Sequence, residues 1–278
     1  MGTRIRRAVH AGTFYGEDPA TLREEIGLLL EAAGGIAGGE VIQGIIAPHA
    51  GYIFSGPPAA HAYQRLRGRR FARVVVIGPS HYEWFDGVAT WLGDAFETPL
   101  GHVPVDASLV ERLIGKGDLI HDEPRAHEPE HSIEVELPFL QEVLEPGWML
   151  VPLLAARQSP GLMRSLGERV GEMLRADGQP SLVVASSDLY HGEDIQECLA
   201  SDRRCAEALG RFDPDAFLRG AAQGEYQACG AGPIAATMWA TQRLGATACE
   251  VLTVTNSNET CLTASRRVVG YLAATLHT

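Results

Sequence analysis

The sequence predicts a single α/β domain over residues 1–278, with parallel strands at its centre. Three observations support this fold class. Short apolar runs typical of buried strands alternate with helical patterns from end to end. No repeat, low-complexity tract or shift in composition marks a domain boundary, and several apolar runs end in a similar polar turn that contains histidine. A chain of 278 residues, 45% of them hydrophobic, is long enough to form one such domain.

The helices are expected where apolar residues recur at helical spacing. The first covers residues 22–33, because Asp18 and Pro19 suit the N-cap and N1 positions and Gly34 and Gly35 end the pattern. A later helix, at 132–144, contains Pro138, which should kink or interrupt it. The other expected helices cover 56–66, 106–114, 160–175, 195–210 and 232–244.

The strands are expected at short apolar runs between these helices. Val74-Val75-Val76-Ile77 is the clearest, because a strand covered by helices on both faces is apolar at every position. The other expected strands cover 41–47, 88–92, 149–154, 182–185, 249–254 and 268–272.

Composition excludes several classes of protein. The 23 lysine and arginine residues against 35 aspartate and glutamate residues give a net charge of −12, which has the wrong sign for binding nucleic acid. Every apolar run is too short to span a membrane, and residues 1–16 lack the apolar core of a signal peptide, so a soluble cytoplasmic protein is expected. Five cysteines without a CxxC pair favour free thiols.

Three of the expected strands end in a polar turn that carries histidine. His49 follows Ile45-Ile46-Ala47-Pro48, His81 follows Ile77-Gly78-Pro79-Ser80, and Asp188 and His191 follow Val183-Val184-Ala185. Because ligands bind outside the carboxyl ends of parallel strands, these side chains are expected in one crevice.

Such a cluster has the composition of a metal site. Imidazoles bind zinc, copper, iron and nickel, and two histidines with one anionic ligand are typical of non-haem Fe(II) sites. The third ligand is Asp188, Glu134 or a thiolate. Cys229 is the candidate thiolate, because it lies just before a helical pattern whose N–H groups favour a negative charge.

Two hydrolase interpretations are less consistent with the sequence. His127-Glu128-Pro129-Glu130-His131 matches the zinc protease pattern HExxH, but Pro129 disfavours the helix on which both histidines would have to lie. We therefore expect His127 in a surface loop and His131 in the pocket lining, oriented by Glu134. Serines near Asp188 and His191 offer the parts of a serine hydrolase, but the GxSxG nucleophile motif is absent.

Five motifs in order resemble those of the MEMO family (mediator of cell motility), which includes the AmmeMemoRadiSam system protein B. They are Ala47-Pro48-His49-Ala50-Gly51-Tyr52, Gly78-Pro79-Ser80-His81, Glu130-His131-Ser132-Ile133-Glu134, Ser186-Ser187-Asp188 with His191, and Cys229-Gly230 with Pro233-Ile234. The segments 11–15 (AGTFY) and 270–274 (GYLAA) also fit, so the resemblance covers essentially the whole chain.

The resemblance implies a fold like that of the class III extradiol dioxygenases, with a central mixed, mostly parallel sheet and helices on both faces. It also implies metal ligands at His49, His81 and Cys229, and nearby acidic and histidine groups at Asp188 and His191. The expected metal is Fe(II) or copper, with zinc as the alternative, because a thiolate in place of a carboxylate favours softer or redox-active ions.

The expected activity is oxygen or superoxide chemistry on an unknown small molecule or peptide, with Asp188, His191 and His131 as catalytic groups. Two alternatives stay open, a non-enzymatic module that binds peptide or metabolite in the same cleft, and an extradiol-type dioxygenase. The resemblance also implies a functional link to a radical SAM protein and an AMMECR-type protein, and no nucleic acid or membrane partner.

Overall fold

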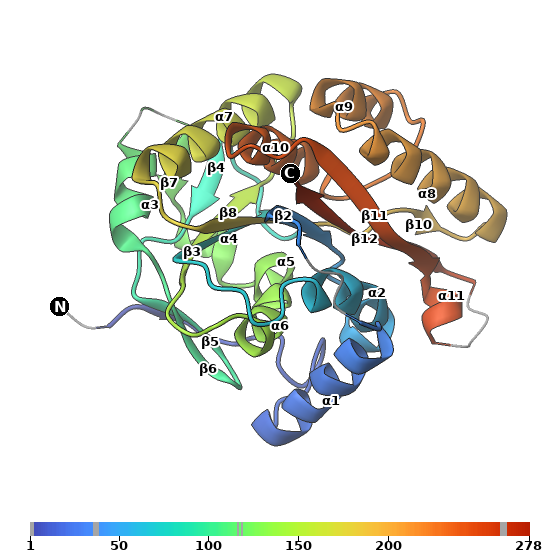
Figure 1. Cartoon of the computed structure of the whole chain (residues 1–278), viewed down its shortest axis with the longest axis horizontal. Helices are drawn as coiled ribbons and strands as arrows, with labels where there is room; N and C mark the ends of the chain where they lie inside the picture. The colour runs from blue at the N-terminus through green and yellow to red at the C-terminus, as the bar shows by residue number, and fades with distance from the viewer. Residues whose placement is uncertain (1–2, 36–38, 116, 118, 262–265) are drawn as a thin grey trace.

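The computed structural model describes residues 3–35, 39–115, 117, 119–261 and 266–278 (Figure 1). The helices are α1 (Pro19–Ala32), α2 (Tyr52–Gln64), α3 (Ala107–Ile114), α4 (Pro124–His127), α5 (His131–Glu134), α6 (Glu136–Val143), α7 (Pro160–Asp177), α8 (Ile195–Gly210), α9 (Pro214–Ala222), α10 (Ala231–Arg243) and α11 (Ser257–Thr260). The strands are β1 (Ile5–Arg6), β2 (Ile42–Ala47), β3 (Arg73–Pro79), β4 (Val88–Thr90), β5 (Ala95–Thr98), β6 (Gly101–Pro104), β7 (Ile120–Asp122), β8 (Met149–Ala155), β9 (Ser181–Ser186), β10 (His191–Gly192), β11 (Ala248–Asn256) and β12 (Val268–His277).

The larger sheet has a parallel centre and antiparallel flanks. Its strand order is β10-β12-β2-β9-β3-β8-β4-β7, and β11 pairs with β12. The strands β2, β9, β3 and β8 run parallel, with Ile45 opposite Val184 and Val75 opposite both Val183 and Val151. On the flanks, β12 runs antiparallel to β2, and β4 runs antiparallel to β8. The central strands therefore end at the same edge of the sheet.

Helices cover both faces of this sheet. The helix α10 packs on β2, β3 and β9 and against α7, whereas α2, α5 and α6 lie on the other side of the sheet (Figure 1). The predicted α/β fold class is thus confirmed, with its mixed sheet between two helical layers. Among the described residues, no helix combines the length and the apolar character needed to cross a bilayer.

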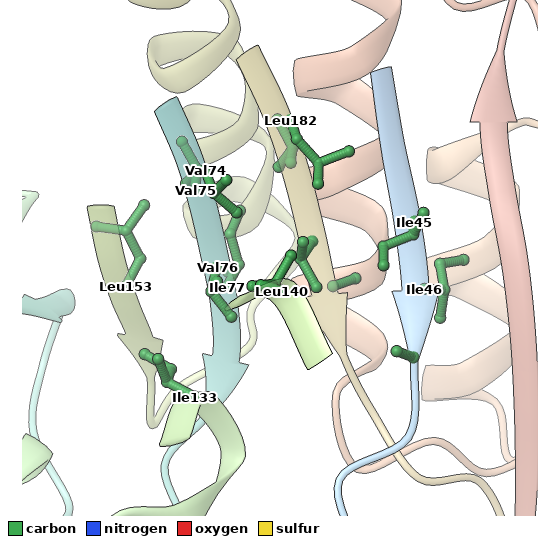
Figure 2. Close-up of a cluster of buried hydrophobic side chains, with 14 of the residues drawn as sticks. Ile45, Ile46, Val74, Val75, Val76, Ile77, Ile133, Leu140, Leu153 and Leu182 are labelled. Carbon is green, nitrogen blue, oxygen red and sulfur yellow. The ribbon is translucent and has the colours of Figure 1, made fainter. Parts of the chain in front are cut away.

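The core lies between the central strands and these helices. Figure 2 shows the strands that carry Leu153, Ile77, Leu182 and Ile45 side by side, all pointing the same way. Each side chain labelled there is 1% exposed or less. Ile133 of α5 packs beside the ends of β3 and β8, so the core reaches the edge where the polar turns begin.

Two expected helices differ from the sequence prediction. The helix expected at 132–144 is divided at Val135 into α5 and α6, because Pro138 has no N–H to donate to the carbonyl of Glu134. The helix expected at 56–66 begins earlier, at Tyr52, and tolerates Pro57 and Pro58 in its interior.

A second, three-stranded sheet carries the N-terminal segment. Its order is β1-β5-β6, with β1 parallel to β5 and Arg6 opposite Phe96. This sheet was not predicted, since its strands are two to four residues long. It places Arg6 next to the segment that carries α4 and α5, where its side chain donates hydrogen bonds to two backbone carbonyls.

Candidate metal centre

The turns after β2 and β3 bring two histidines together. His49 and His81 each lie two residues beyond the end of their strand, at Ala47 and Pro79. Because β9 pairs in parallel with both strands, the two turns leave the same edge of the sheet. The imidazole ring centroids are 5.1 Å apart, in an edge-on arrangement. This is the convergence that the sequence predicts for the strand ends.

His131, the first residue of α5, completes a group of three. Its ring stacks on that of His81 with centroids 4.4 Å apart and lies 5.3 Å from that of His49. One ring nitrogen from each histidine lies within 4.8 Å of the others, so the group could hold a metal ion. His131 was predicted in the pocket lining as a catalytic group, and its position among possible ligands is a finding of the structure.

A buried serine fixes the orientation of His49. Ser186 Oγ donates a hydrogen bond to the Ser132 carbonyl at 2.6 Å, so this hydroxyl must accept one from His49 Nδ1, 2.7 Å away. His49 Nε2 is thereby left without a proton and can donate its lone pair to a metal.

A buried carboxylate plays the same part for His81. Glu130 Oε1 lies 2.9 Å from His81 Nδ1, and Glu130 Oε2 accepts the His81 backbone N–H at 2.6 Å. Burial disfavours the charge on Glu130, but the hydrogen bonds from His81 lower its pKa to about 2. The ionised carboxylate accepts from His81 Nδ1, so His81 Nε2 is open to a ligand. Glu130 was not predicted as a site residue, although it begins one of the five motifs that resemble the MEMO family.

His131 is held less tightly. Its Nδ1 lies 3.3 Å from Glu130 Oε1 without the alignment of a hydrogen bond. Burial lowers the pKa of His131 to about 3, and burial together with the charge of His81 lowers that of His49 to about 3. Both rings are therefore neutral near pH 7, the form that binds metal ions.

Cys229 also lies beside the histidine group, in the loop that leads into α10. It directly precedes Gly230, the N-cap of α10, and its Sγ lies 3.3 Å from His49 Nε2. The backbone N–H of Asp188 donates to Sγ at 3.2 Å. Burial, followed by the charge of Asp188, raises the pKa of the Cys229 thiol, so this group forms a thiolate only when a cation lies beside it.

Asp188 and His191 lie at the border of the histidine group. Asp188 Oδ1 accepts the backbone N–H of His49 at 2.9 Å, and burial raises the pKa of this carboxyl. His191 Nδ1 donates to the carbonyl of Leu189 at 3.0 Å, which leaves Nε2 open. A cavity of about 560 Å³ is lined by both residues and by His131, and its lining also includes Phe14, Phe54 and Tyr271.

Two expectations about the segment 127–134 are wrong. Glu134 does not orient the His131 ring by a hydrogen bond, because both of its oxygens are instead bonded by Arg6, Tyr15 and the backbone N–H of His10. His127 is 1% exposed rather than in a surface loop. It ends α4, and its ring lies edge-on to those of Trp91 and Phe96, away from the histidine group; it therefore does not pair with His131 as HExxH requires.

The donor set fits a metal ion. One ring nitrogen from each of three imidazoles lies within 4.8 Å of the others, and the Cys229 thiol lies 3.3 Å from one of them. Two of the imidazoles have their other nitrogen bound to a protein oxygen, and burial disfavours the cationic forms of His49 and His131. A site of nitrogen and sulfur donors suits iron, copper or zinc better than magnesium or calcium, which prefer oxygen.

Comparisons with known proteins agree with this architecture. A solved structure of an uncharacterized protein from Escherichia coli K12 superimposes with a TM-score of 0.52 over 84% of this chain and 99% of that chain, at 13% identity, which is a likeness of fold.

The sequence comparisons are more specific. A MEMO1 family protein of Methanothermobacter thermautotrophicus is 36% identical over 96% of this chain and 98% of its own length. A MEMO1 family protein of Aquifex aeolicus is 32% identical over 97% of this chain and 98% of its own length. The family model described as Memo-like protein matches residues 6–275. The chain therefore belongs to the Memo family.

Proposed function

We propose that this protein is a metal-dependent oxidoreductase in which His49, His81 and Cys229 hold one iron or copper ion. The observation that carries the proposal is the convergence of these donors, with His131, from separate segments at the carboxyl edge of the parallel strands. When bound, such an ion supplies redox chemistry with oxygen or superoxide.

The choice of Cys229 as third ligand follows from its contact with His49. Its Sγ lies 3.3 Å from His49 Nε2, the ring nitrogen that carries the lone pair. At this separation both atoms would be able to bind the same ion. Because the pKa of this thiol is raised by burial and by Asp188, an ion bound beside it would be what converts it to the thiolate.

The remaining polar groups move protons and shape the reaction space. His191 Nε2 is open toward the cavity, and a histidine is suited to general acid or base work near neutral pH. His131, whose ring stacks on that of His81, lines the same cavity. Phe14, Phe54 and Tyr271 provide apolar surfaces that favour a small, partly apolar substrate.

The experiment is reconstitution of metal-free protein with Fe(II) or Cu(I) without oxygen, followed by measurement of oxygen consumption and superoxide removal. The loaded protein is expected to react above the background of the free ion, and His191→Ala is expected to keep its metal but react more slowly. No reaction above background, with small-molecule or peptide binding unchanged by chelation, would contradict the proposal and support a binding module instead.

A further inference from the structure

The N-terminal strand β1 contains a fully buried charge that the proposed chemistry does not use. Arg6 is 1% exposed, and its guanidinium forms an ion pair with Glu134, which is 0% exposed. Burying two charges costs a large desolvation free energy, and such a pair often stabilises a protein no more than apolar side chains of similar volume. The contacts of this pair therefore need an explanation other than stability.

The guanidinium of Arg6 binds several points along residues 127–134. Its Nε donates to the carbonyl of His127 at 3.0 Å, and its Nη2 donates to the carbonyl of Glu130 at 2.6 Å. Together with the pair to Glu134, these bonds span residues 127–134. That segment carries Glu130, which orients His81, and His131, whose ring stacks on His81.

Residues 11–15, which fit the MEMO resemblance in the sequence, and His10 before them contact the same helix and its Glu134 carboxylate. Glu134 Oε1 accepts the Tyr15 hydroxyl at 2.5 Å and the backbone N–H of His10 at 2.9 Å. The ring of Phe14 packs on His131 with centroids 4.8 Å apart. Glu134 therefore joins α5, which begins with His131, to residues 6–15, which we call the N-terminal arm.

We propose that Arg6 is a positioning residue of the metal centre. With Tyr15 as its partner on Glu134, it fixes the backbone of 127–134, so that Glu130 and His131 meet His81 in the geometry a metal requires. The proposal rests on the proposed metal site and adds that the site is assembled only when the N-terminal arm is docked. It assigns to Arg6 no contact with metal or substrate.

The test is titration of metal-free protein with Co(II), followed by its visible absorption, which reports both affinity and ligand geometry. Arg6→Met alone would leave Glu134 buried without a cation, so the main variant is Arg6→Met/Glu134→Leu, which removes both charges. Arg6→Lys is the second variant, since it keeps the charge but cannot reach Glu134 and both carbonyls at once. The control is Arg73→Met, which breaks a largely buried ion pair with Asp106 at the opposite end of β3 from His81.

The double variant is expected to bind Co(II) about 10- to 100-fold more weakly than the unmodified protein, with an altered spectrum, as when groups that orient metal ligands are removed. The Co(II) affinity of Arg6→Lys should lie between those of the double variant and the unmodified protein. Arg73→Met should lower the melting temperature but not the affinity for Co(II). Unchanged affinity and spectrum in both Arg6 variants would overturn the positioning role while leaving the metal site intact. Failure of the unmodified protein to bind Co(II) would overturn the metal site itself, and the role of Arg6 with it.

Discussion

Two histidines of the candidate centre each have one nitrogen bound to a protein oxygen and the other left open. His49 donates to Ser186 and His81 donates to Glu130, which fixes tautomer and ring orientation before any ion binds. The sequence predicts His49 and His81 because each follows an apolar strand. It does not indicate Glu130, since the pairing of Glu130 with His81 joins residues 49 apart through the fold.

Replacing Glu130 with glutamine tests this orienting role. Glu130→Gln keeps the size of the side chain but removes the charge that favours the Nδ1–H form of His81, so metal affinity is expected to fall about 10- to 100-fold. The matched control is Glu128→Gln, two residues away and exposed. Competition with a chelator of known affinity measures the change, and equal affinities in the two variants would show that Glu130 does not orient a ligand.

Asp202 provides a pH-dependent prediction away from the proposed ligands. Burial raises its pKa to about 6, although hydrogen bonds from the Cys198 thiol and the Tyr190 backbone N–H oppose the shift. Because the folded-state pKa lies above the unfolded value, the free energy of unfolding falls as pH rises from about 4 through 6. At pH 8, Asp202→Asn should therefore be more stable than the unmodified protein, by an amount on the order of 2–3 kcal/mol. Below pH 4 the two proteins should be nearly equal in stability. Urea unfolding at both pH values measures this, and a constant difference between the proteins would contradict it.

Among the elements, α7 and α10 pack unusually closely. A Cβ on Gly167 would lie 2.4 Å from the Ala236 carbonyl oxygen and 2.8 Å from Trp239 Cβ. Gly167→Ala should therefore separate the helices and destabilise the protein by about 1–3 kcal/mol. Gly161→Ala in the same helix meets nothing within 4 Å, so it should be neutral or slightly stabilising. Thermal unfolding compares the two, and equal melting temperatures would show that α7 has room to move.

The predictability of each element depends on whether its signal is local. Asp18 and Pro19 correctly predict the start of α1, where Asp18 accepts from the Thr21 N–H. Asp213 and Pro214 give the same signal for α9, although no helix was predicted there. The two-residue strands β1 and β10 have no local signal, because they are defined only by pairing with β5 and β12.

At the scale of the whole molecule, the site follows from the parallel centre of the sheet. The strands β2, β3 and β9 end at one edge, so the turns after them must meet there. That much is predictable from apolar runs that end in polar turns. The contribution of the N-terminal arm cannot be predicted in this way. Nothing in the residues around Arg6 shows that it is buried, and only the fold brings it to Glu134.

The central claim is that His49, His81 and Cys229 hold a metal ion, and elemental analysis of protein purified without oxygen and without an affinity tag tests it most directly. The unmodified protein is expected to contain nearly one iron or copper ion per chain. The control variant Cys261→Ser should contain as much, because the Cys261 thiol lies near the Ile53 carbonyl and not near the proposed ligands. His49→Ala and Cys229→Ser should lose it while remaining folded. Equal metal content in all four proteins, or none in the unmodified protein even after reconstitution, would contradict the claim.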